Sequence, residues 1–133
     1  MGDRANIVIE TNSGGKSAPL FIYSHWDGLY GMAEKLHRAL KRKQRWNDDS
    51  YLTRIIVDEV LKGAAYPDTG YGISRHEQDN EHPFLCVDIA AQKVFLRPAK
   101  CGNGGSYKVT TKPTNTWTFD EYVALDPATV GAE

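Results

Sequence analysis

Residues whose side chains could bind a ligand are concentrated in two short stretches. The run FIYSHWDG at 21–28 leads from a strand pattern into a histidine, a tryptophan and an aspartate, and GYGISRHEQDNEHP at 70–83 offers a glycine-flanked tyrosine followed by many donors and acceptors. Loops at strand ends often carry functional groups, and ligand sites combine rings with a few polar groups. The predicted ligand-binding residues are Arg4, His25, Trp26, Asp27, Tyr71, Ser74, Arg75, Asn80, Glu81 and His82.

Simpler roles account for the same residues. The pair Asp27-Gly28 is typical of a turn, Trp26 could cap the core, and His25 could form a local hydrogen bond. Glycines on both sides of Tyr71 are equally typical of a β-bulge, and a solvated loop is polar in any case. At the level of sequence both interpretations stay open.

Neither a metal centre nor a catalytic centre is predicted. His76 and His82 have five residues between them, a spacing that matches neither the helical HExxH pattern nor a zinc finger. The GGKS run looks like the end of a P-loop, but Glu10 stands where that motif begins with glycine, and a strand follows. We therefore expect no cofactor, no metal and binding without turnover; the enzymatic alternative is a small hydrolase acting on a nucleotide signal, with Glu81 or Asp27 as base.

Composition limits the class of protein further. The chain has 133 residues, with 16 basic and 17 acidic side chains and a formal net charge of −1, which argues against general nucleic-acid binding. No apolar run approaches the length of a membrane span, and the N-terminus lacks a signal-peptide pattern. We expect a cytoplasmic protein that does not bind membranes, with Cys86 and Cys101 as reduced, buried thiols.

The residue pattern predicts the elements that must position these side chains. Apolar residues at spacings of three and four predict helices at about 29–43 and 50–62, the second capped by one of Asp48, Asp49 and Ser50. Runs rich in β-branched and aromatic residues predict strands, and a strand end leads into a short C-terminal helix within 116–125. The predicted strands are 4–10, 19–25, 72–76, 83–90, 93–98 and an edge strand at 106–111.

This order of elements contains no alternation of single strands and helices. It favours an α+β fold with a mostly antiparallel sheet of about five or six strands, two main helices on one face and a short C-terminal helix. Residues 1–125 are predicted to form a single globular domain, and 126–133 a disordered tail.

Four separated motifs resemble a family of small uncharacterised proteins carried by phages and bacteria. The motifs are MGDRANIVI, SHWDG, RWNDDSYLTRII and TGYGIS…DNEHPFLCVDI, and together they cover about residues 1–96. The resemblance carries no assigned activity. It implies an accessory protein of phage origin that acts in the host cytoplasm, and many such proteins counter bacterial immunity by sequestering a nucleotide signal or by binding a defence enzyme.

Two main hypotheses follow. In the first, the protein sequesters a small nucleotide-derived ligand, with a base stacked on Trp26 or Tyr71 and phosphates held by Arg4 and Arg75. In the alternative, it inhibits a host defence protein by surface complementarity. The exposed edge predicted at 106–111 also favours a homo-oligomer. The aromatic anchors expected for protein binding are Tyr23, Tyr30, Tyr107 and Trp117.

Overall fold

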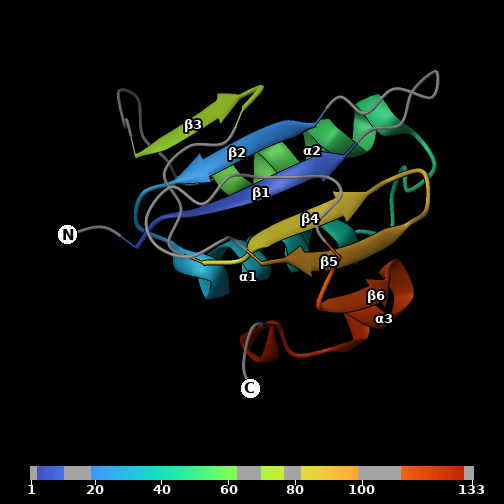
Figure 1. The fold of residues 1–133 in the computed structure, drawn as a ribbon. Coiled ribbons are helices and arrows are strands. Elements are labelled where there is room, and N and C mark those ends of the chain that lie inside the picture. Colours follow the sequence, from blue (N-terminus) through green and yellow to red (C-terminus); the bar gives the residue numbers. More distant parts are fainter. Residues whose placement is uncertain (1–2, 11–18, 63–69, 77–81, 99–111, 131–133) are drawn as a thin grey trace.

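The chain folds into one sheet with a layer of helices on one side (Figure 1). The computed structural model describes residues 3–10, 19–62, 70–76, 82–98 and 112–130. It confirms the predicted α+β fold of six mostly antiparallel strands, two main helices and a short C-terminal helix. The elements in order are β1 (Ala5–Glu10), β2 (Leu20–Ser24), α1 (Gly28–Lys41), α2 (Asp49–Leu61), β3 (Tyr71–Ser74), β4 (Phe84–Asp88), β5 (Lys93–Arg97), β6 (Asn115–Thr118), α3 (Phe119–Ala124) and the 3₁₀ turn η2 (Pro127–Thr129).

The strands lie in the order β3-β2-β1-β4-β5-β6. Every neighbouring pair is antiparallel except β1 and β4, which run parallel with Ile7 opposite Leu85. Consequently β1, β3 and β4 all begin at the end of the sheet where β2 finishes, which we call the near end. The near end is marked by Ala5, Ser24, Tyr71 and Phe84, and the opposite, far end by Glu10, Leu20, Ser74 and Asp88.

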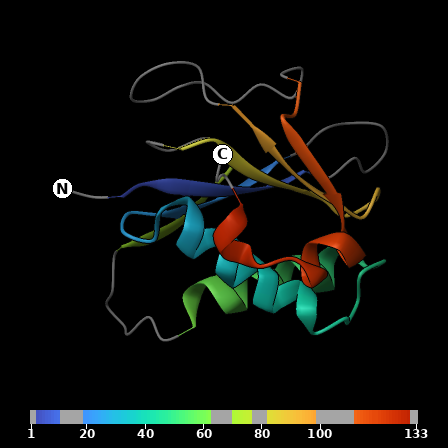
Figure 2. The same cartoon turned by 90° about the horizontal axis from the view of Figure 1, so that it is seen from below.

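One face of the sheet packs against the helices, which all lie on the same side of it (Figure 2). On α1, Met32, Leu36 and Leu40 recur every fourth residue, so their side chains form one buried stripe. Each such side chain contributes about 1.5–3 kcal/mol relative to an exposed one. On α3, Tyr122 is fully buried and donates its hydroxyl to the carbonyl oxygen of Ala33 at 2.7 Å, which fastens the C-terminal helix to α1.

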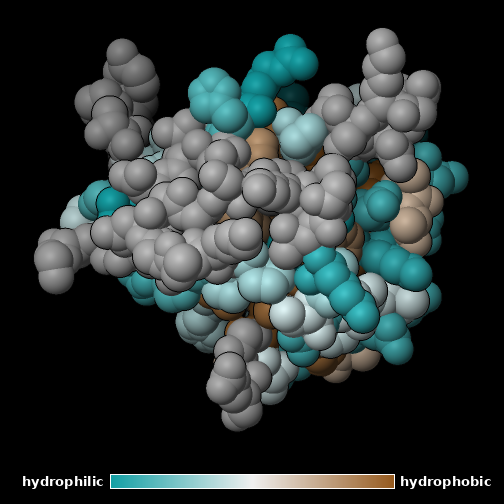
Figure 3. Space-filling view, in the orientation of Figure 1, coloured by the Kyte–Doolittle hydropathy of each residue, from teal (hydrophilic) through white to brown (hydrophobic). Residues whose placement is uncertain are grey.

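The opposite face of the sheet carries a second buried cluster, because side chains alternate along each strand. In the part of the chain that the structure describes, no helix lies on this face (Figure 1). In the same orientation, Figure 3 shows a described surface that is mostly hydrophilic or intermediate, with hydrophobic residues limited to small areas. The cluster consists of Val8, Phe21, Phe84, Cys86 and Phe95.

A buried ion pair lies on this same face. The Nε and Nη2 atoms of Arg97 donate to the two carboxylate oxygens of Glu10 at 2.9 and 3.2 Å. The guanidinium also lies 4.8 Å from the centre of the Phe95 ring. Burial raises the pKa of the Cys86 thiol well above its ordinary value, so Cys86 is the unreactive free thiol that the sequence predicts, whereas Cys101 lies outside the described residues.

Local signals set the ends of the helices. The Asp48 carboxylate accepts from the Tyr51 amide at 3.3 Å, so the predicted cap of α2 is confirmed. At α3, Thr118 and Glu121 form a reciprocal capping box. Between α1 and α2, Lys43 and Arg45 adopt left-handed backbone conformations with φ of 53° and 61°, each of which costs about 1–2 kcal/mol for a residue other than glycine.

The C-terminal segment adds a small piece of ordered structure. Pro127–Thr129, within the stretch predicted to be a disordered tail, form η2, with Asp126 accepting from the Ala128 amide at 3.0 Å. Val130 is only 4% exposed and belongs to the main core. The edge strand predicted at 106–111 lies outside the described residues. None of the described helices is long and apolar enough to cross a membrane.

Candidate functional site

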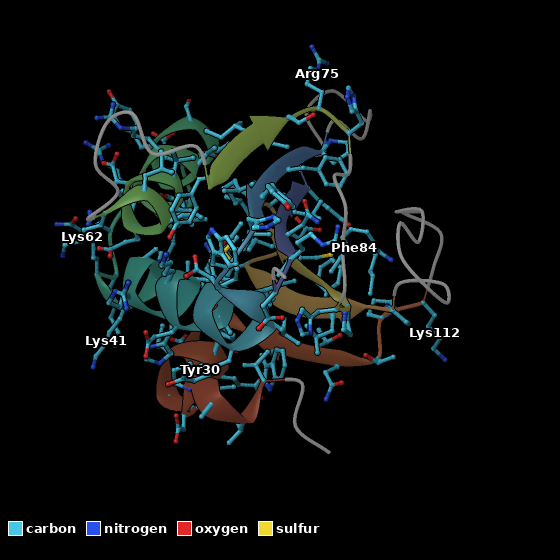
Figure 4. All side chains as sticks on the ribbon, turned by 90° about the vertical axis from the view of Figure 1, so that its left-hand side faces the viewer. Tyr30, Lys41, Lys62, Arg75, Phe84 and Lys112 are labelled. Atoms are coloured by element: carbon cyan, nitrogen blue, oxygen red, sulfur yellow. The ribbon has the colours of Figure 1, made fainter. Side chains whose placement is uncertain are left out.

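The near end of the sheet brings the two polar stretches of the sequence together. Because β2 pairs with β3, Ser24 lies opposite Tyr71, and the His25 amide donates to the carbonyl oxygen of Gly70 at 2.9 Å. The start of the chain joins them, since the Asp3 amide donates to the carbonyl oxygen of His25 at 2.8 Å. Arg4 follows directly. Figure 4 views the molecule from this end.

Two rings at the end of β2 form the exposed part of the site. Trp26 is 62% exposed, and its ring meets the His25 ring edge to face with centroids 4.4 Å apart. His25 is held from the other side, because its Nδ1 lies 2.9 Å from the Tyr23 hydroxyl. Trp26 therefore presents a large apolar ring to solvent beside a fixed imidazole.

The carboxylate of Asp3 lies at the start of α1. His82 Nε2 lies 2.5 Å from Asp3 Oδ1, and the Gly28 amide donates to the carbonyl oxygen of Asp3 at 2.8 Å. Gly28 has a φ of +65°, and a Cβ there would come within 2.3 Å of the Asp3 carboxylate. Glycine is thus required at position 28, and Asp3 occupies the positive end of the helix where an external anion would otherwise bind.

A second group of polar side chains, which we call the internal network, lies partly buried between the sheet and the helices. Lys35 Nζ donates to Asp27 Oδ2 at 2.7 Å, to the Tyr71 hydroxyl at 2.8 Å and to the carbonyl oxygen of Val60 at 3.3 Å. Ser24 Oγ donates to the same Asp27 oxygen at 2.9 Å. This network joins α1, α2, β3 and the end of β2 through one ammonium group.

The network keeps its two charges ionised. Burial opposes ionisation of Asp27, but hydrogen bonds from Lys35 and Ser24 outweigh it and lower the pKa of the carboxyl group. Burial also opposes the charge on Lys35, yet its bonds to Asp27 and Tyr71 raise the pKa of the amine. An aspartate with a lowered pKa that already accepts two hydrogen bonds is a weak general base.

The structure divides the ten predicted ligand residues into separate groups. Arg4, His25, Trp26 and His82 gather at the near end on or beside the surface, whereas Asp27 and Tyr71 belong to the internal network. Asn80 and Glu81 lie outside the described residues.

Ser74 and Arg75 do not join the near-end group. β3 runs away from His25, so at about 3.3 Å per residue the four steps from Tyr71 to Arg75 carry the chain about 13 Å toward the far end. Figure 4 places Arg75 beyond the tip of β3, with its side chain directed outward. A single pocket that includes both Arg75 and His25 is therefore not supported by the arrangement of the strands.

Sequence reasoning missed Asp3 and Lys35 at this end of the molecule, and it gave Tyr23 only as an anchor for protein binding. A signal for Lys35 was present, because it lies three residues after the buried Met32 and four before the buried Ala39, at the margin of the apolar stripe.

Among the described residues, no group of three or more histidine, cysteine, aspartate or glutamate side chains is placed to hold a metal ion. Comparisons of the chain with models of protein families, with curated protein sequences and with solved structures found no match.

Proposed function

We propose that the protein binds a small nucleotide-derived ligand at the near end of the sheet and holds it without turnover. The observation that carries this proposal is the Trp26 ring, 62% exposed and fixed edge to face against His25. An exposed indole suits stacking of a base, which contributes about 1–3 kcal/mol per base. Arg4 lies at the same end, next to Asp3, and its guanidinium would supply positive charge for a phosphate, while His82 is bonded to Asp3 beside it.

The internal network supports binding rather than hydrolysis. Two residues, Glu81 and Asp27, were predicted as the base of a hydrolase, and of these only Asp27 is among the described residues. The Asp27 carboxylate is bonded to Lys35 and Ser24. Its lowered pKa makes it a poor proton acceptor at neutral pH. The biological role that fits is that of a phage-type accessory protein that removes a nucleotide signal from a bacterial defence system, in the host cytoplasm and as a homo-oligomer.

Calorimetry and thermal-shift measurements with cyclic dinucleotides and cyclic ADP-ribose isomers test the proposal. Trp26→Ala should weaken binding of the active compound about ten- to a hundredfold, because a stacking ring is lost. Tyr51→Ala is the matched control, since Tyr51 is another exposed aromatic residue, at 57%, on α2. Absence of heat and thermal shift with all of these compounds, or equal effects of the two variants, would contradict the proposal.

Recovery of the ligand separates storage from catalysis. The bound nucleotide is released by denaturing the protein and compared with the starting compound by mass spectrometry. We expect intact ligand. Altered products would instead favour the small hydrolase.

A second candidate function is inhibition of a host defence protein through exposed aromatic residues. Tyr30, one of the expected anchors, is 53% exposed in the first turn of α1, and Trp26, which precedes that helix, is 62% exposed. Of the other three expected anchors, Tyr23 is half-buried with its hydroxyl 2.9 Å from His25 Nδ1, Trp117 packs partly buried against the core, and Tyr107 lies outside the described residues. This candidate predicts that Trp26→Ala and Tyr30→Ala both abolish co-purification with the host protein, while nucleotides have no effect.

A further inference from the structure

The turn between α1 and α2 concentrates positive charge at the far end of the molecule. Figure 1 places this connection at the end opposite the N-terminus. Gln92, in the turn between β4 and β5, donates its side-chain amide to the carbonyl oxygen of Trp46 at 3.5 Å, which fixes the turn beside the sheet. This surface is therefore separate from the proposed ligand site. We call it the basic turn, and its cations are Lys41, Arg42, Lys43 and Arg45.

A carboxylate of α2 neutralises one of these cations, Arg42, and the other three have no such partner among the described residues. Glu59, whose side chain is 5% exposed, pairs with Arg42 at 2.5 Å and with Arg38 at 3.4 Å. Within the described segments of the chain, no carboxylate forms an ion pair with the other three cations of the basic turn. All three are exposed, and Figure 4 shows Lys41 extending outward from the helix layer.

Arg45 is oriented without being neutralised. Its guanidinium lies 4.6 Å from the centre of the Tyr51 ring, and that ring is 57% exposed. Stacking on an aromatic face fixes the guanidinium plane and leaves its N–H groups directed outward. This is the arrangement that binds a carboxylate through two parallel hydrogen bonds.

The backbone of the basic turn is fixed as well. Trp46 donates its indole N–H to the carbonyl oxygen of Leu40 at 3.1 Å and packs edge to face on Phe119, with centroids 5.3 Å apart. Lys43 and Arg45 are both in the left-handed region, which glycine adopts without strain. The turn itself would form more easily with glycine, so the two cations point to a role in binding.

The surroundings of the turn indicate the kind of partner. Four exposed or partly exposed carboxylates border it, two where α2 begins and two where α3 begins beside Trp46. A long polyanion such as a nucleic acid would have to cross this acidic border, whereas a short acidic protein segment can contact the cations alone. We propose that the basic turn is a docking surface for an acidic segment of a partner protein. The bordering carboxylates are Asp48, Asp49, Asp120 and Glu121.

Fluorescence anisotropy with the full chain tests this proposal. The probes are a labelled short peptide of alternating glutamate and glycine, and a labelled single-stranded DNA oligonucleotide of equal charge. The double variant Lys43→Gly with Arg45→Gly removes two cations and relieves two left-handed positions. We expect it to weaken peptide binding about tenfold or more and to leave the melting temperature unchanged or higher.

Arg54→Gln is the matched control, because Arg54 is an exposed cation on α2 that is already paired with Asp58 at 2.9 Å. It should bind the peptide about as tightly as the unchanged protein. The proposal is overturned by equal losses in the two variants, by absence of peptide binding to the unchanged protein, or by tighter binding of the oligonucleotide than of the peptide.

Discussion

The two ends of α1 use charge in opposite ways. At its start, the N-cap residue Asp27 forms a partly buried pair with Lys35, about two turns further along the helix, and Asp3 pairs with His82 beside the first turn. After its end, Lys43 and Arg45 are exposed on strained backbone, and among the residues described no carboxylate pairs with them. The difference teaches that charge at the start of the helix holds four elements in place, whereas charge beyond its end contributes little to the fold.

The largest expected effect follows from breaking the internal pair at the start of the helix. Lys35→Met should lower the free energy of unfolding by about 2–4 kcal/mol, because it leaves the Asp27 carboxylate partly buried without its cation. The Tyr71 hydroxyl and the carbonyl oxygen of Val60 lose a donor at the same time. Denaturation by urea, followed by circular dichroism, measures the change.

The double variant Lys35→Met with Asp27→Asn is the control for this prediction. It removes the unpaired charge, so it should recover part of the lost stability. A Lys35→Met variant that unfolds within about 0.5 kcal/mol of the unchanged protein would show that the pair does not hold the near end together.

An intermediate effect is expected from the buried carboxylate between the two main helices. Glu59→Gln should cost about 1–2 kcal/mol, because Glu59 is 5% exposed while its partners Arg38 and Arg42 are 42% and 37% exposed and can be solvated. Asp58→Asn breaks the exposed pair with Arg54. High salt should reduce the stability loss of Glu59→Gln less than it reduces the stability loss of Asp58→Asn. Equal salt dependence of the two variants would contradict this prediction, because it would show that Glu59 contributes to stability as an exposed surface charge does.

The dependence of stability on pH tests the two paired carboxylates, Asp27 at the start of α1 and Glu59 beside its end. Burial opposes ionisation of Asp27 and of Glu59, but the cations bonded to them lower both pKa values in the folded state. Their contribution is therefore complete above the ordinary carboxyl pKa values of 3.8 and 4.5 and is lost as the pH falls through the lower folded values.

Urea denaturation over a series of pH values measures this effect. Asp27→Asn should flatten the fall in stability at acid pH, whereas Lys41→Gln, at the end of α1, should leave the curve parallel to that of the unchanged protein. An Asp27→Asn curve that falls as steeply as that of the unchanged protein would contradict the assignment.

Most of the fold could be predicted because its signals are local. Alternation along the strands, the stripe of Met32 and Leu36 on α1, and the cap at Asp48 all depend on residues within one or two turns of each other. The parallel pairing of β1 with β4 could not be predicted, since it joins Ile7 to Leu85 across most of the chain.

The candidate site was harder to predict for the same reason. The sequence predicts that the segments around His25 and Tyr71 meet, and the β2–β3 pairing does bring them together. The direction of β3, which carries Arg75 away, and the partner of Asp27, which is Lys35, depend on contacts between distant elements. Residue type alone could not separate the side chains that hold the fold from those that face solvent.

The smallest expected effect lies at the other end of the helix and has the opposite sign. Lys43 follows the C-cap Arg42, donates its amide to the carbonyl oxygen of Leu40 at 3.0 Å and has a φ of 53°, so it occupies the position where helices commonly end in glycine. Lys43→Gly should raise the free energy of unfolding by about 0.5–1 kcal/mol, because the relief of left-handed strain exceeds the entropy that glycine adds to the unfolded chain. Lys41→Gly, two positions earlier and still helical, should instead cost up to about 1 kcal/mol. If both variants destabilise the protein equally, Lys43 supports the fold as Lys35 does, and the contrast between the two ends of α1 is lost.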